Sequence, residues 1–569
     1  MASGRAPLLV CASLLLALAV VCGANKDDDY RMVDRIVRQL MRCSKIPSLS
    51  LAMISLEDVA SYNKGYYDSR SSGTRPSTHS SVYCIGGGTQ AFTAVLLAKL
   101  IDENENVTWN TPVQDILGRR LGLPDLYRSD NLNLRDILAM RSGLAGMEIL
   151  PIAKPFDREK LVRRLVYAPR VAGFREKYVH NEVLFALIED LIQELGGDSW
   201  QNLLQLHILQ PLRMASTKVI GDTDDVDLAN PAVSANGVPV IIDIDSHSGL
   251  EVIAPAAGLC TSADDMSKWF RFLLTSGRDS RNEQLVRKEA LEYTFKPIQS
   301  RGNGGDPVTE GYRKTTSYFR DQNALGWIRG HYRGSPFISQ DGSLPGYQSL
   351  STILPDRRIA VHVAFSGGNS PRAFAAKTLL NIIALDHLMK DHSSSSDHNI
   401  CDRLDDLEKQ HPKVKKSSYP QASAYQGDRD LNDFAGYYRN YAFGDINIRF
   451  NESESEDLLM DYGMASYKLA PTYENDTFAM IAQPGPLWYS TNTDMTRGRL
   501  FAVFSTHPLD AERVETVTIA GFDRNIDPQF SRDPQRPRVE GRSEPRCGAC
   551  NIVLSVWCLA VLSVSLFFR

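Results

Sequence analysis

The chain lacks any run of lysine and arginine long enough to indicate nucleic-acid binding, and its formal net charge is -5. We therefore exclude nucleic acid as a partner. No pair of cysteines or histidines has the spacing of a zinc site, so we expect no metal and no other cofactor. We also find no internal repeat.

The composition is otherwise that of an ordinary globular protein. Hydrophobic residues make up 43% and charged residues 23% of the 569 residues, which is enough apolar material for a sizeable core. This length indicates two or three domains rather than one.

The first 24 residues are predicted to be a signal peptide. Arg5 precedes an apolar run from Leu8 to Val21, and small residues follow at the expected cleavage site. The mature chain then starts near Asn25. A signal anchor that stays in the bilayer is the alternative, but the apolar run is short for a membrane span.

Residues 551–569 form a hydrophobic tail that ends in Arg569. Small residues and a polar spacer precede it, which is the pattern of a GPI-anchor signal. A short transmembrane helix is the competing interpretation. Either tail attaches the protein to the membrane, so we expect it at the extracellular face of the plasma membrane.

Nine cysteines are present, and five of them lie in the terminal segments. The other four are Cys43, Cys84, Cys260 and Cys401. An even number in a secreted protein permits two disulfides, with three possible connectivities. Sequons at Asn106, Asn451 and Asn475 are candidate glycosylation sites and are expected on the surface.

The pattern of apolar residues predicts a mixed α/β domain over residues 30–390. Apolar residues from Val33 to Met41 recur at helical spacing, and a buried strand over residues 46–54 follows. Further helices are predicted at 93–102, 134–140, 184–195 and 373–389, and strands at 350–354 and 359–365. This order suits a central sheet with an inserted helical lobe.

The composition changes after residue 390. Residues 391–428 contain a serine run and a lysine cluster, and we interpret them as a linker. Residues 429–524 show alternating strands separated by turn residues, which predicts a small all-β domain. Residues 525–550 are rich in proline and arginine and are interpreted as a stalk.

Six short motifs occur in one order along the first domain: YCIGGGTQAFTA (83–94), LRDILAMRSGL (134–144), PLRMAST (211–217), APAAGLCTSADDM (254–266), LGW (325–327) and residues 342–355. Together they resemble the β-lactamase-related family of serine hydrolases, which includes class C β-lactamases, DD-peptidases and penicillin-binding proteins. The resemblance implies a central antiparallel sheet flanked by helices, with an inserted helical lobe. The segment 433–450 is similar to the lipocalin-like domain that follows this domain in some members.

The resemblance implies a Ser-x-x-Lys motif at the start of a helix, which supplies the family's nucleophile and base. Gly87 stands at the serine position and Gln90 at the lysine position. Glycine has no side-chain oxygen, and a glutamine amide does not act as a base near pH 7. We therefore expect the family's acyl transfer to be absent.

The other two family motifs are also incomplete. Helix register places the Tyr-x-Asn motif at Val179 and Asn181, so the tyrosine is missing, and Tyr178 is one residue off and should point elsewhere. The His/Lys-x-Gly motif reads Gln340-Asp341-Gly342, so the cation is missing. We expect Asp341 to repel a ligand carboxylate.

We expect no other residue to replace the missing nucleophile or base. Thr89 is off the nucleophile position and has no base. Ser142 belongs to a turn that is structural in the family, and Cys84 is better explained as a strand or disulfide cysteine. His180 and His331 are expected to be surface or packing residues.

The resemblance also suggests the disulfides. In the family fold the first and last helices lie side by side, so Cys43 and Cys401 could pair. Cys84 and Cys260 both border the former catalytic cleft and could form a second bridge.

Three functions remain. The first is a catalytically inactive, membrane-attached protein (a pseudoenzyme) that binds an unknown ligand or protein partner in the former active-site cleft. The second is an active hydrolase, an esterase, peptidase or β-lactamase-like enzyme, with an unconventional nucleophile. The third is a structural surface protein whose domains act as spacers.

Overall fold

The computed structural model describes residues 30–57, 61–68, 76–301, 318–367, 370–390, 400–410, 425, 427–451, 457–493, 496 and 498–535. The predicted signal peptide, most of the stalk and the hydrophobic tail lie outside these residues. No helix in the described ranges is both long and apolar enough to cross a membrane. Asn106 and Asn475 are exposed, as predicted for the sequons.

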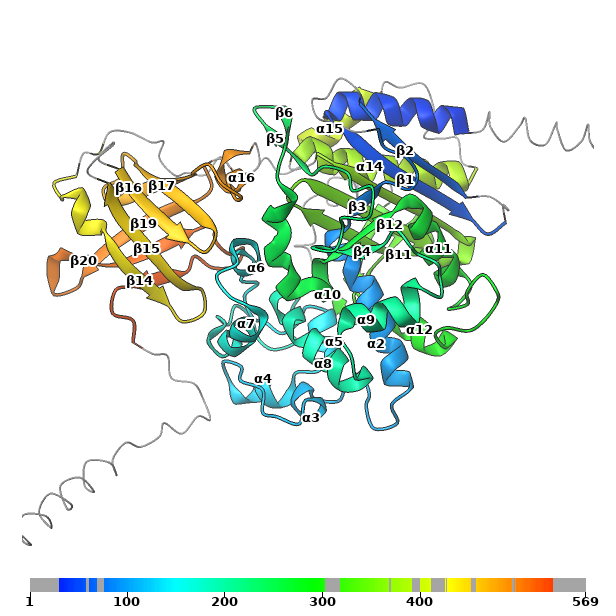
Figure 1. Ribbon diagram of the computed structural model, residues 1–569, viewed down its shortest axis with the longest axis horizontal. Coiled ribbons are helices and arrows are strands. Elements are labelled where there is room, and N and C mark those ends of the chain that lie inside the picture. The colour runs from blue at the N-terminus through cyan, green and yellow to red at the C-terminus, as the bar shows by residue number, and fades with distance from the viewer. Residues whose placement is uncertain are drawn as a thin grey trace, which may run out of the picture.

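The first domain is built on an eight-stranded antiparallel sheet with the order β2-β1-β13-β12-β11-β10-β9-β8 (Figure 1). Its strands are β1 (Ser48–Ser55), β2 (Tyr62–Tyr67), β8 (Gln299–Ser300), β9 (Tyr318–Asn323), β10 (Ile328–Tyr332), β11 (Ser335–Leu344), β12 (Tyr347–Leu354) and β13 (Ile359–Ser366). Every residue of β1, β12 and β13 is buried. Such complete burial requires a cover on both faces of the sheet.

One face is covered by α14 (Pro371–Leu388), α15 (Ile400–Gln410) and the helix over residues 30–44. Leu49, Leu51 and Met53 of β1 point to this side. Ala52 and Ile54 point to the other side, as the two-residue period of a strand requires. The predicted first helix, first strand and closing helix are therefore confirmed.

The other face carries α2 (Thr89–Asp102), α11 (Ala263–Leu274) and a helical lobe. Further helices on this side are α3 (Val113–Ile116), α4 (Leu126–Asn131), α5 (Leu134–Leu138), α6 (Ile149–Ala153), α7 (Arg158–Arg164), α8 (Ala186–Gly196), α9 (Trp200–Leu204), α10 (Ala254–Ala257) and α12 (Lys288–Thr294). Tight turns η1 (Gly86–Gly88), η2 (Leu165–Tyr167), η3 (Val183–Phe185) and η5 (Ile244–Ile253), and the π-helical η4 (Gln205–Leu209), connect them. A small sheet pairs β3 (Val82–Cys84), β7 (Leu259–Ser262) and β4 (Lys218–Val219), and β5 (Ala232–Ala235) and β6 (Val238–Ile241) form a hairpin.

Both suggested disulfides are present. Cys43 is bonded to Cys401, and their Cα atoms are 5.7 Å apart. Cys84 is bonded to Cys260, its partner in the antiparallel pair of β3 and β7. Helix α15 lies inside the segment interpreted as a linker, and the first bridge joins it to the first domain.

The second domain is a closed barrel of eight strands. They are β14 (Gly436–Asn440), β15 (Gly444–Asn451), β16 (Asp457–Tyr462), β17 (Ala465–Pro471), β18 (Thr477–Ala482), β19 (Phe501–His507), β20 (Asp510–Ala520) and β21 (Gln529–Ser531), with η8 (Leu431–Phe434) before them and α16 (Tyr489–Asn492) between β18 and β19. Strand β21 corrects the predicted boundary, because it lies in the segment interpreted as stalk yet pairs with both β20 and β14. Three residues are too few to give a strand pattern in the sequence.

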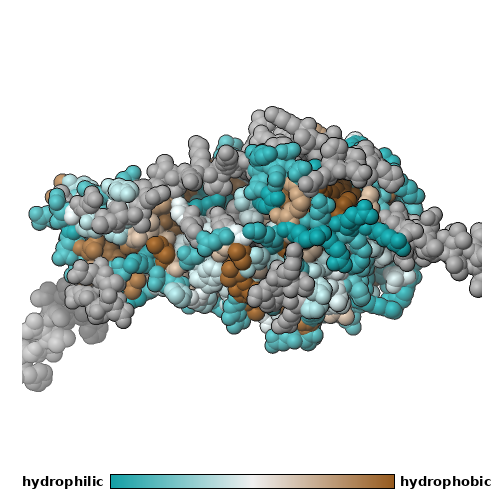
Figure 2. Space-filling model, turned by 90° about the horizontal axis from the view of Figure 1, so that it is seen from above, coloured by the Kyte–Doolittle hydropathy of each residue, from teal (hydrophilic) through white to brown (hydrophobic). Residues whose placement is uncertain are grey.

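The barrel packs against the helical lobe (Figure 1). The amide of Met464 donates a hydrogen bond of 2.8 Å to the carbonyl of Ala153, at the end of α6. Arg164, in α7, donates from Nη1 to the carbonyl of Tyr441 at 2.6 Å. Seen from above, the described surface is mostly hydrophilic, and its hydrophobic patches are separate from one another (Figure 2).

A buried ion pair connects the sheet to α14. Asp341 of β11 accepts hydrogen bonds from Lys377 of α14 and from Arg320 of β9, the latter at 2.7 Å. Burial raises the pKa of Asp341, but Lys377 and Arg320 outweigh it and lower the pKa to about 2. The expectation that Asp341 repels a carboxylate in the cleft is wrong, because its side chain lies on the α14 face and its charge is neutralised there.

We predict that Lys377→Met lowers the free energy of unfolding by about 3 kcal/mol, since it removes one partner of a buried carboxylate. Lys288→Met is the control, because Lys288 forms an exposed pair with Glu292, and a change below about 1 kcal/mol is expected. Urea denaturation measures both. Because the folded-state pKa of Asp341 is depressed, the wild-type contribution is present above about pH 4 and is lost as the pH falls towards 2. Equal losses for the two variants would contradict the assignment.

Candidate functional site

The site forms where η1 and the start of α2 lie against β11. Ser349 of β12 donates from Oγ to the carbonyl of Ile85 at 2.9 Å. A Cβ atom on Gly342 would lie 1.7 Å from the same carbonyl oxygen, so only glycine permits this approach. The contact fixes η1 against the sheet.

The predicted nucleophile and base positions are neighbours. A Cβ atom on Gly87 would lie 3.5 Å from Nε2 of Gln90, so the two positions share one side of the helix start. The same Cβ would be 2.9 Å from the backbone oxygen of Asp341. Cβ atoms essentially never approach a backbone oxygen this closely, so a serine at residue 87 would require β11 to move.

Glu182 occupies the space beside Gly87, and the sequence did not single it out. Its Oε1 accepts a hydrogen bond of 2.9 Å from Nε2 of Gln90 and lies 3.6 Å from the Cβ position of Gly87. Burial, and next the charge of Glu148, raise the pKa of Glu182 to about 7, against opposing effects of Arg524 and Gln90. Its only sequence signal is its place directly after Asn181.

Val179 and Asn181 have structural roles. Val179 is buried, and its amide donates to the carbonyl of Met140 at 2.8 Å. Asn181 donates from Nδ2 to the carbonyl of Ala145 at 2.7 Å and accepts from the amide of Leu184 at 3.1 Å. Asn181 thereby supports the turn η3 that precedes α8.

His180 lies beside Glu182, and Tyr178 is its hydrogen-bond partner. A hydrogen bond of 3.1 Å joins the Tyr178 hydroxyl to Nδ1 of His180. Nε2 of His180 lies 3.8 Å from Oε1 of Glu148 and 3.9 Å from Oε1 of Glu182. Burial, with the nearby guanidinium groups of Arg524 and Arg301, lowers the pKa of His180 to about 3, so the imidazole is neutral at pH 7.

The barrel contributes two residues next to the site. Oδ2 of Asp523 accepts a hydrogen bond of 2.6 Å from the amide of Met147. Nε of Arg524 lies 3.0 Å from Oε1 of Glu148. Residues 376 positions apart in the chain therefore meet at the edge of the site. No local pattern in the sequence indicates this contact.

Gln340 lies on the face of β11 that is turned towards η1. It shares this face with Gly342, two residues along, whereas Asp341 points to the opposite face. The Gln340 side chain is buried, with 5% exposed. An uncharged amide thus occupies the position of the family's cation.

The other candidate residues do not supply a nucleophile. Thr89 is fully buried, and its Oγ1 accepts a hydrogen bond from the amide of Leu259. Ser142 is buried and accepts from the amide of Leu144. Cys84 is in a disulfide, and His331 is exposed on β10. These outcomes agree with the structural roles predicted for Ser142 and Cys84.

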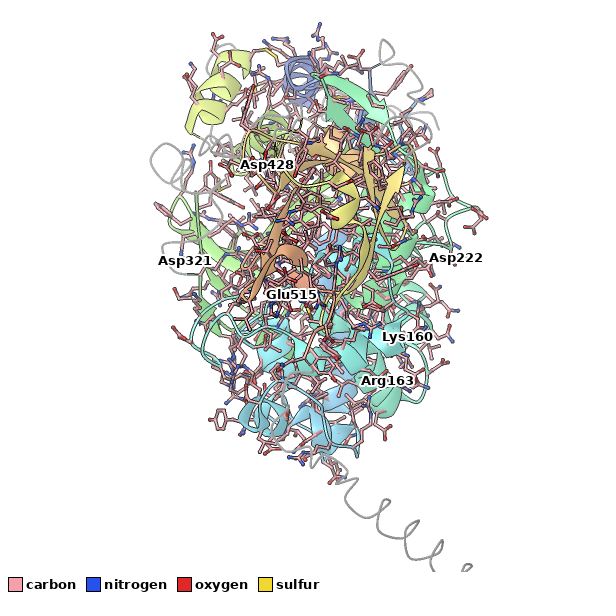
Figure 3. The ribbon with its side chains drawn as sticks, turned by 90° about the vertical axis from the view of Figure 1, so that its left-hand side faces the viewer. Lys160, Arg163, Asp222, Asp321, Asp428 and Glu515 are labelled. Carbon is pink, nitrogen blue, oxygen red and sulfur yellow. A yellow bond between two sulfur atoms is a disulfide. The ribbon has the colours of Figure 1, made fainter. Side chains whose placement is uncertain are left out.

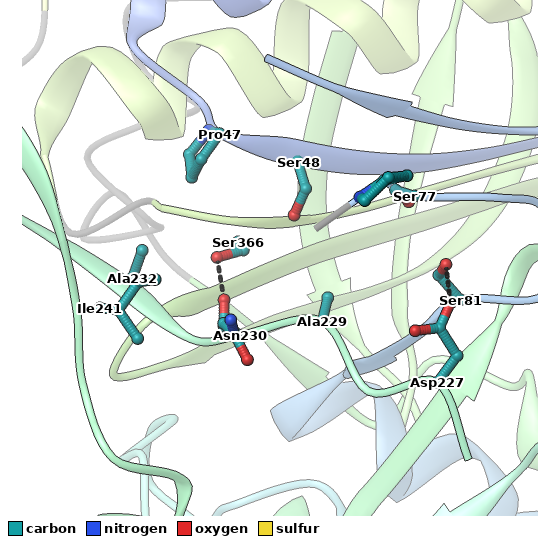
Figure 4. A pocket seen from close by; sticks show the side chains of 11 residues that line it. Pro47, Ser48, Ser77, Ser81, Asp227, Ala229, Asn230, Ala232, Ile241 and Ser366 are labelled. Atoms are coloured by element: carbon teal, nitrogen blue, oxygen red, sulfur yellow. Dashed lines mark hydrogen bonds between the residues drawn. The ribbon is translucent and has the colours of Figure 1, made fainter. Parts of the chain in front are cut away.

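A shallow pocket rich in serine lies elsewhere, at the ends of β1 and β13 (Figure 4). Its hydroxyls are engaged: Ser366 donates to the carbonyl of Asn230, and Ser81 donates to Oδ2 of Asp227 at 2.5 Å. None of Gly87, Gln90 and Glu182 lines it. We therefore place the candidate site at η1 and β11.

The fold and the site position are those of a serine hydrolase related to penicillin-binding proteins. The chain matches the family model Beta-lactamase over residues 33–385, and it belongs to that family.

The chain is similar to several relatives and solved structures, three of which illustrate the range. It is 25% identical over 360 residues to the unguisins hydrolase ungD of Aspergillus violaceofuscus, covering 60% of this chain and 62% of the relative. It is 24% identical to Gigasin-6 of Magallana gigas, covering 48% of this chain and 91% of that protein. The octameric penicillin-binding protein homologue from Pyrococcus abyssi has a TM-score of 0.50 at 18% identity, covering 88% of this chain and 99% of that structure. This last likeness concerns the fold alone.

We predict that Gly87→Ala destabilises the protein by about 1–3 kcal/mol, because the new Cβ would push against the backbone of β11. Gly88→Ala is the matched control in the same turn. The three atoms nearest to its Cβ would all belong to the Ile85 side chain, at 3.2 Å or more, and that side chain can adjust. Urea denaturation of both variants tests this prediction. Equal stability of the two would show that β11 can move away from residue 87 without a loss of stability.

We predict that Glu182 titrates near pH 7. Arg524→Gln should raise its pKa further by removing a positive charge, and Glu148→Gln should lower it by removing a negative one. NMR titration of the side-chain carboxyl carbons, labelled with carbon-13 and assigned with Glu182→Gln, measures the three values. A pKa near 4 in the wild type would contradict the described burial.

Proposed function

We propose that the chain is a catalytically inactive member of the Beta-lactamase family that binds a ligand or protein partner in the former active-site cleft. One observation carries this proposal: residue 87 has no side chain, and the oxygen of Asp341 would be 2.9 Å from a Cβ atom there. Loss of the nucleophile lowers turnover by about a millionfold in a comparable hydrolase. Residual interactions do not restore a rate of that size.

The second loss supports the same conclusion. A base must receive the proton of an attacking serine, and the Gln90 amide has no basic nitrogen. This amide instead donates to Glu182. The turn at Gly342 and the helix start are kept, so the family's framework persists without its reacting groups.

We also propose that the protein is exposed at the cell surface. Two disulfides in the folded body suit an oxidising compartment. The predicted signal peptide and hydrophobic tail suit secretion followed by attachment to the membrane, through a GPI anchor or a single span. Treatment of cells with phosphatidylinositol-specific phospholipase C separates the two anchors, since it releases only the first.

A second candidate function is direct hydrolysis by water. Glu182 favours it, because a carboxylate with a pKa of about 7 lies 3.6 Å from the Cβ position of Gly87. It could take the proton of a water molecule that attacks a carbonyl carbon and return this proton to the leaving amine or alcohol. Relatives named as hydrolases, with D-aminopeptidases of Gluconobacter oxydans and Brucella ovis among them, add to this alternative.

We predict that a fluorophosphonate probe and a penicillin leave the purified wild-type chain unmodified, because no nucleophile is presented at residue 87. Intact-mass spectrometry detects any adduct. An acyl or phosphonyl adduct that disappears on substitution of one residue would falsify the proposal. Hydrolysis of p-nitrophenyl acetate that is lost in Glu182→Gln, without any adduct, would establish the water mechanism instead.

A further inference from the structure

The former cleft carries the opposite charge to that of the family. Neither Gln90 nor Gln340 is cationic, and two carboxylates, Glu182 and Glu148, stand beside the site. Each is 23% exposed, so both can be reached from solvent. Both lie within 4 Å of Nε2 of His180, and that imidazole is neutral at pH 7.

Glu182 has no strong cationic partner of its own. Within the described ranges, no lysine or arginine nitrogen lies within 4.0 Å of its carboxylate, although Gln90 donates one hydrogen bond to it. A carboxylate that is largely removed from water is stabilised when a cation and further donors approach it. Glu182 therefore offers an incompletely satisfied anionic group.

Gln340 offers the site a second polar group. The residue is 95% buried on the face of β11 turned towards η1. Its amide is not among the fully buried side-chain atoms that lack a hydrogen-bond partner, so it keeps contact with solvent. A polar ligand in the cleft can therefore reach this amide.

Arg524 shows that a cation fits at the rim. Its guanidinium reaches Glu148 from the barrel at 3.0 Å and stays 69% exposed. Arg524 thus neutralises the charge of Glu148 and leaves that of Glu182. An exposed side chain is also free to move when a ligand enters.

We propose that the cleft binds its ligand through a cationic group, an ammonium or guanidinium, that pairs with Glu182 beside Glu148 and Gln340. This inference rests on the proposed non-catalytic binding function and adds the chemical class of the ligand. An anionic ligand of the same size is repelled by the two carboxylates. The nearest cations, Arg524 and Arg301, lie at the edge, on Glu148 and over the ring of Tyr178.

The affinity for a cation should rise with pH. The groups that face Glu182 are His180, Glu148, Arg524 and Gln90. His180 is neutral between pH 6 and pH 8, because burial lowers its pKa to about 3, and burial raises the pKa of Glu148 above its usual value. Because the pKa of Glu182 is about 7, its ionised fraction, and with it the affinity, increases about tenfold across this range.

The test uses two probes of similar size and opposite charge, 2-phenylethylamine and 3-phenylpropionate. Isothermal titration calorimetry with the purified full-length chain measures both at pH 8. The amine is expected to bind at least about tenfold more tightly than the carboxylate. Glu182→Gln should weaken amine binding by about tenfold, since it removes the charge that pairs with the ammonium.

Glu159→Gln is the matched control. Glu159 lies on α7 and forms an exposed ion pair with Arg163, which Figure 3 labels, and its substitution should leave amine binding unchanged. Thermal unfolding of each variant checks that it is folded. Arg524→Gln should tighten amine binding, because it removes the cation that already faces the acids.

Tighter binding of the carboxylate, no binding of either probe, or an amine affinity that Glu182→Gln leaves unchanged would each overturn this inference. Such results leave the non-catalytic function standing if the fluorophosphonate probe still gives no adduct. Covalent labelling of the wild type would instead refute the non-catalytic function, and the comparison of the two charges would still show which probe the cleft prefers.

Discussion

The close approach of β11 to η1 determines the rest of the site. Gly342 lets the strand lie against the carbonyl of Ile85, and the backbone oxygen of Asp341 then faces Gly87. Successive side chains of β11 point to opposite faces of the sheet. In this position of the strand, Gln340 faces the cleft and Asp341 faces α14. A side chain at residue 87 would separate these two backbones, so the missing nucleophile and the tight packing are two aspects of one contact.

With this contact in place, the chain keeps the family's fold although the charged groups of its cleft differ from those of the family. Lys377 and Arg320 hold the carboxylate of Asp341 on the far side of the sheet, where it stabilises the packing of α14. On the cleft side, uncharged amides stand at the former cationic positions, and Glu182 and Glu148 add negative charge. Packing residues and glycines maintain the fold whether or not the site is catalytic. The charged groups of the cleft instead depend on the kind of ligand that it binds.

The barrel is more than a spacer at the end of the chain. Asp523 accepts a hydrogen bond from the backbone of the helical lobe, and Arg524 acts on the ionisation of Glu182 and His180. A purely structural protein does not require a guanidinium of the barrel beside the acids of the helical lobe. Residues of the two domains meet at the edge of the candidate site.

The sequence by itself determined the properties that depend on residue type or local spacing. Gly87 lacks an attacking oxygen in any fold, and apolar periodicity placed the main helices and strands of the first domain. The order of the motifs indicated the family, and the fold implied by that resemblance suggested both disulfide pairs. Only the tertiary structure decided which way Asp341 points, that Tyr178 and His180 enter the site, and that Glu182 and Arg524 belong to it. These facts depend on strand faces, burial and contacts between residues as many as 376 positions apart. Such contacts have no local pattern, because long-range packing brings them together only in the folded chain.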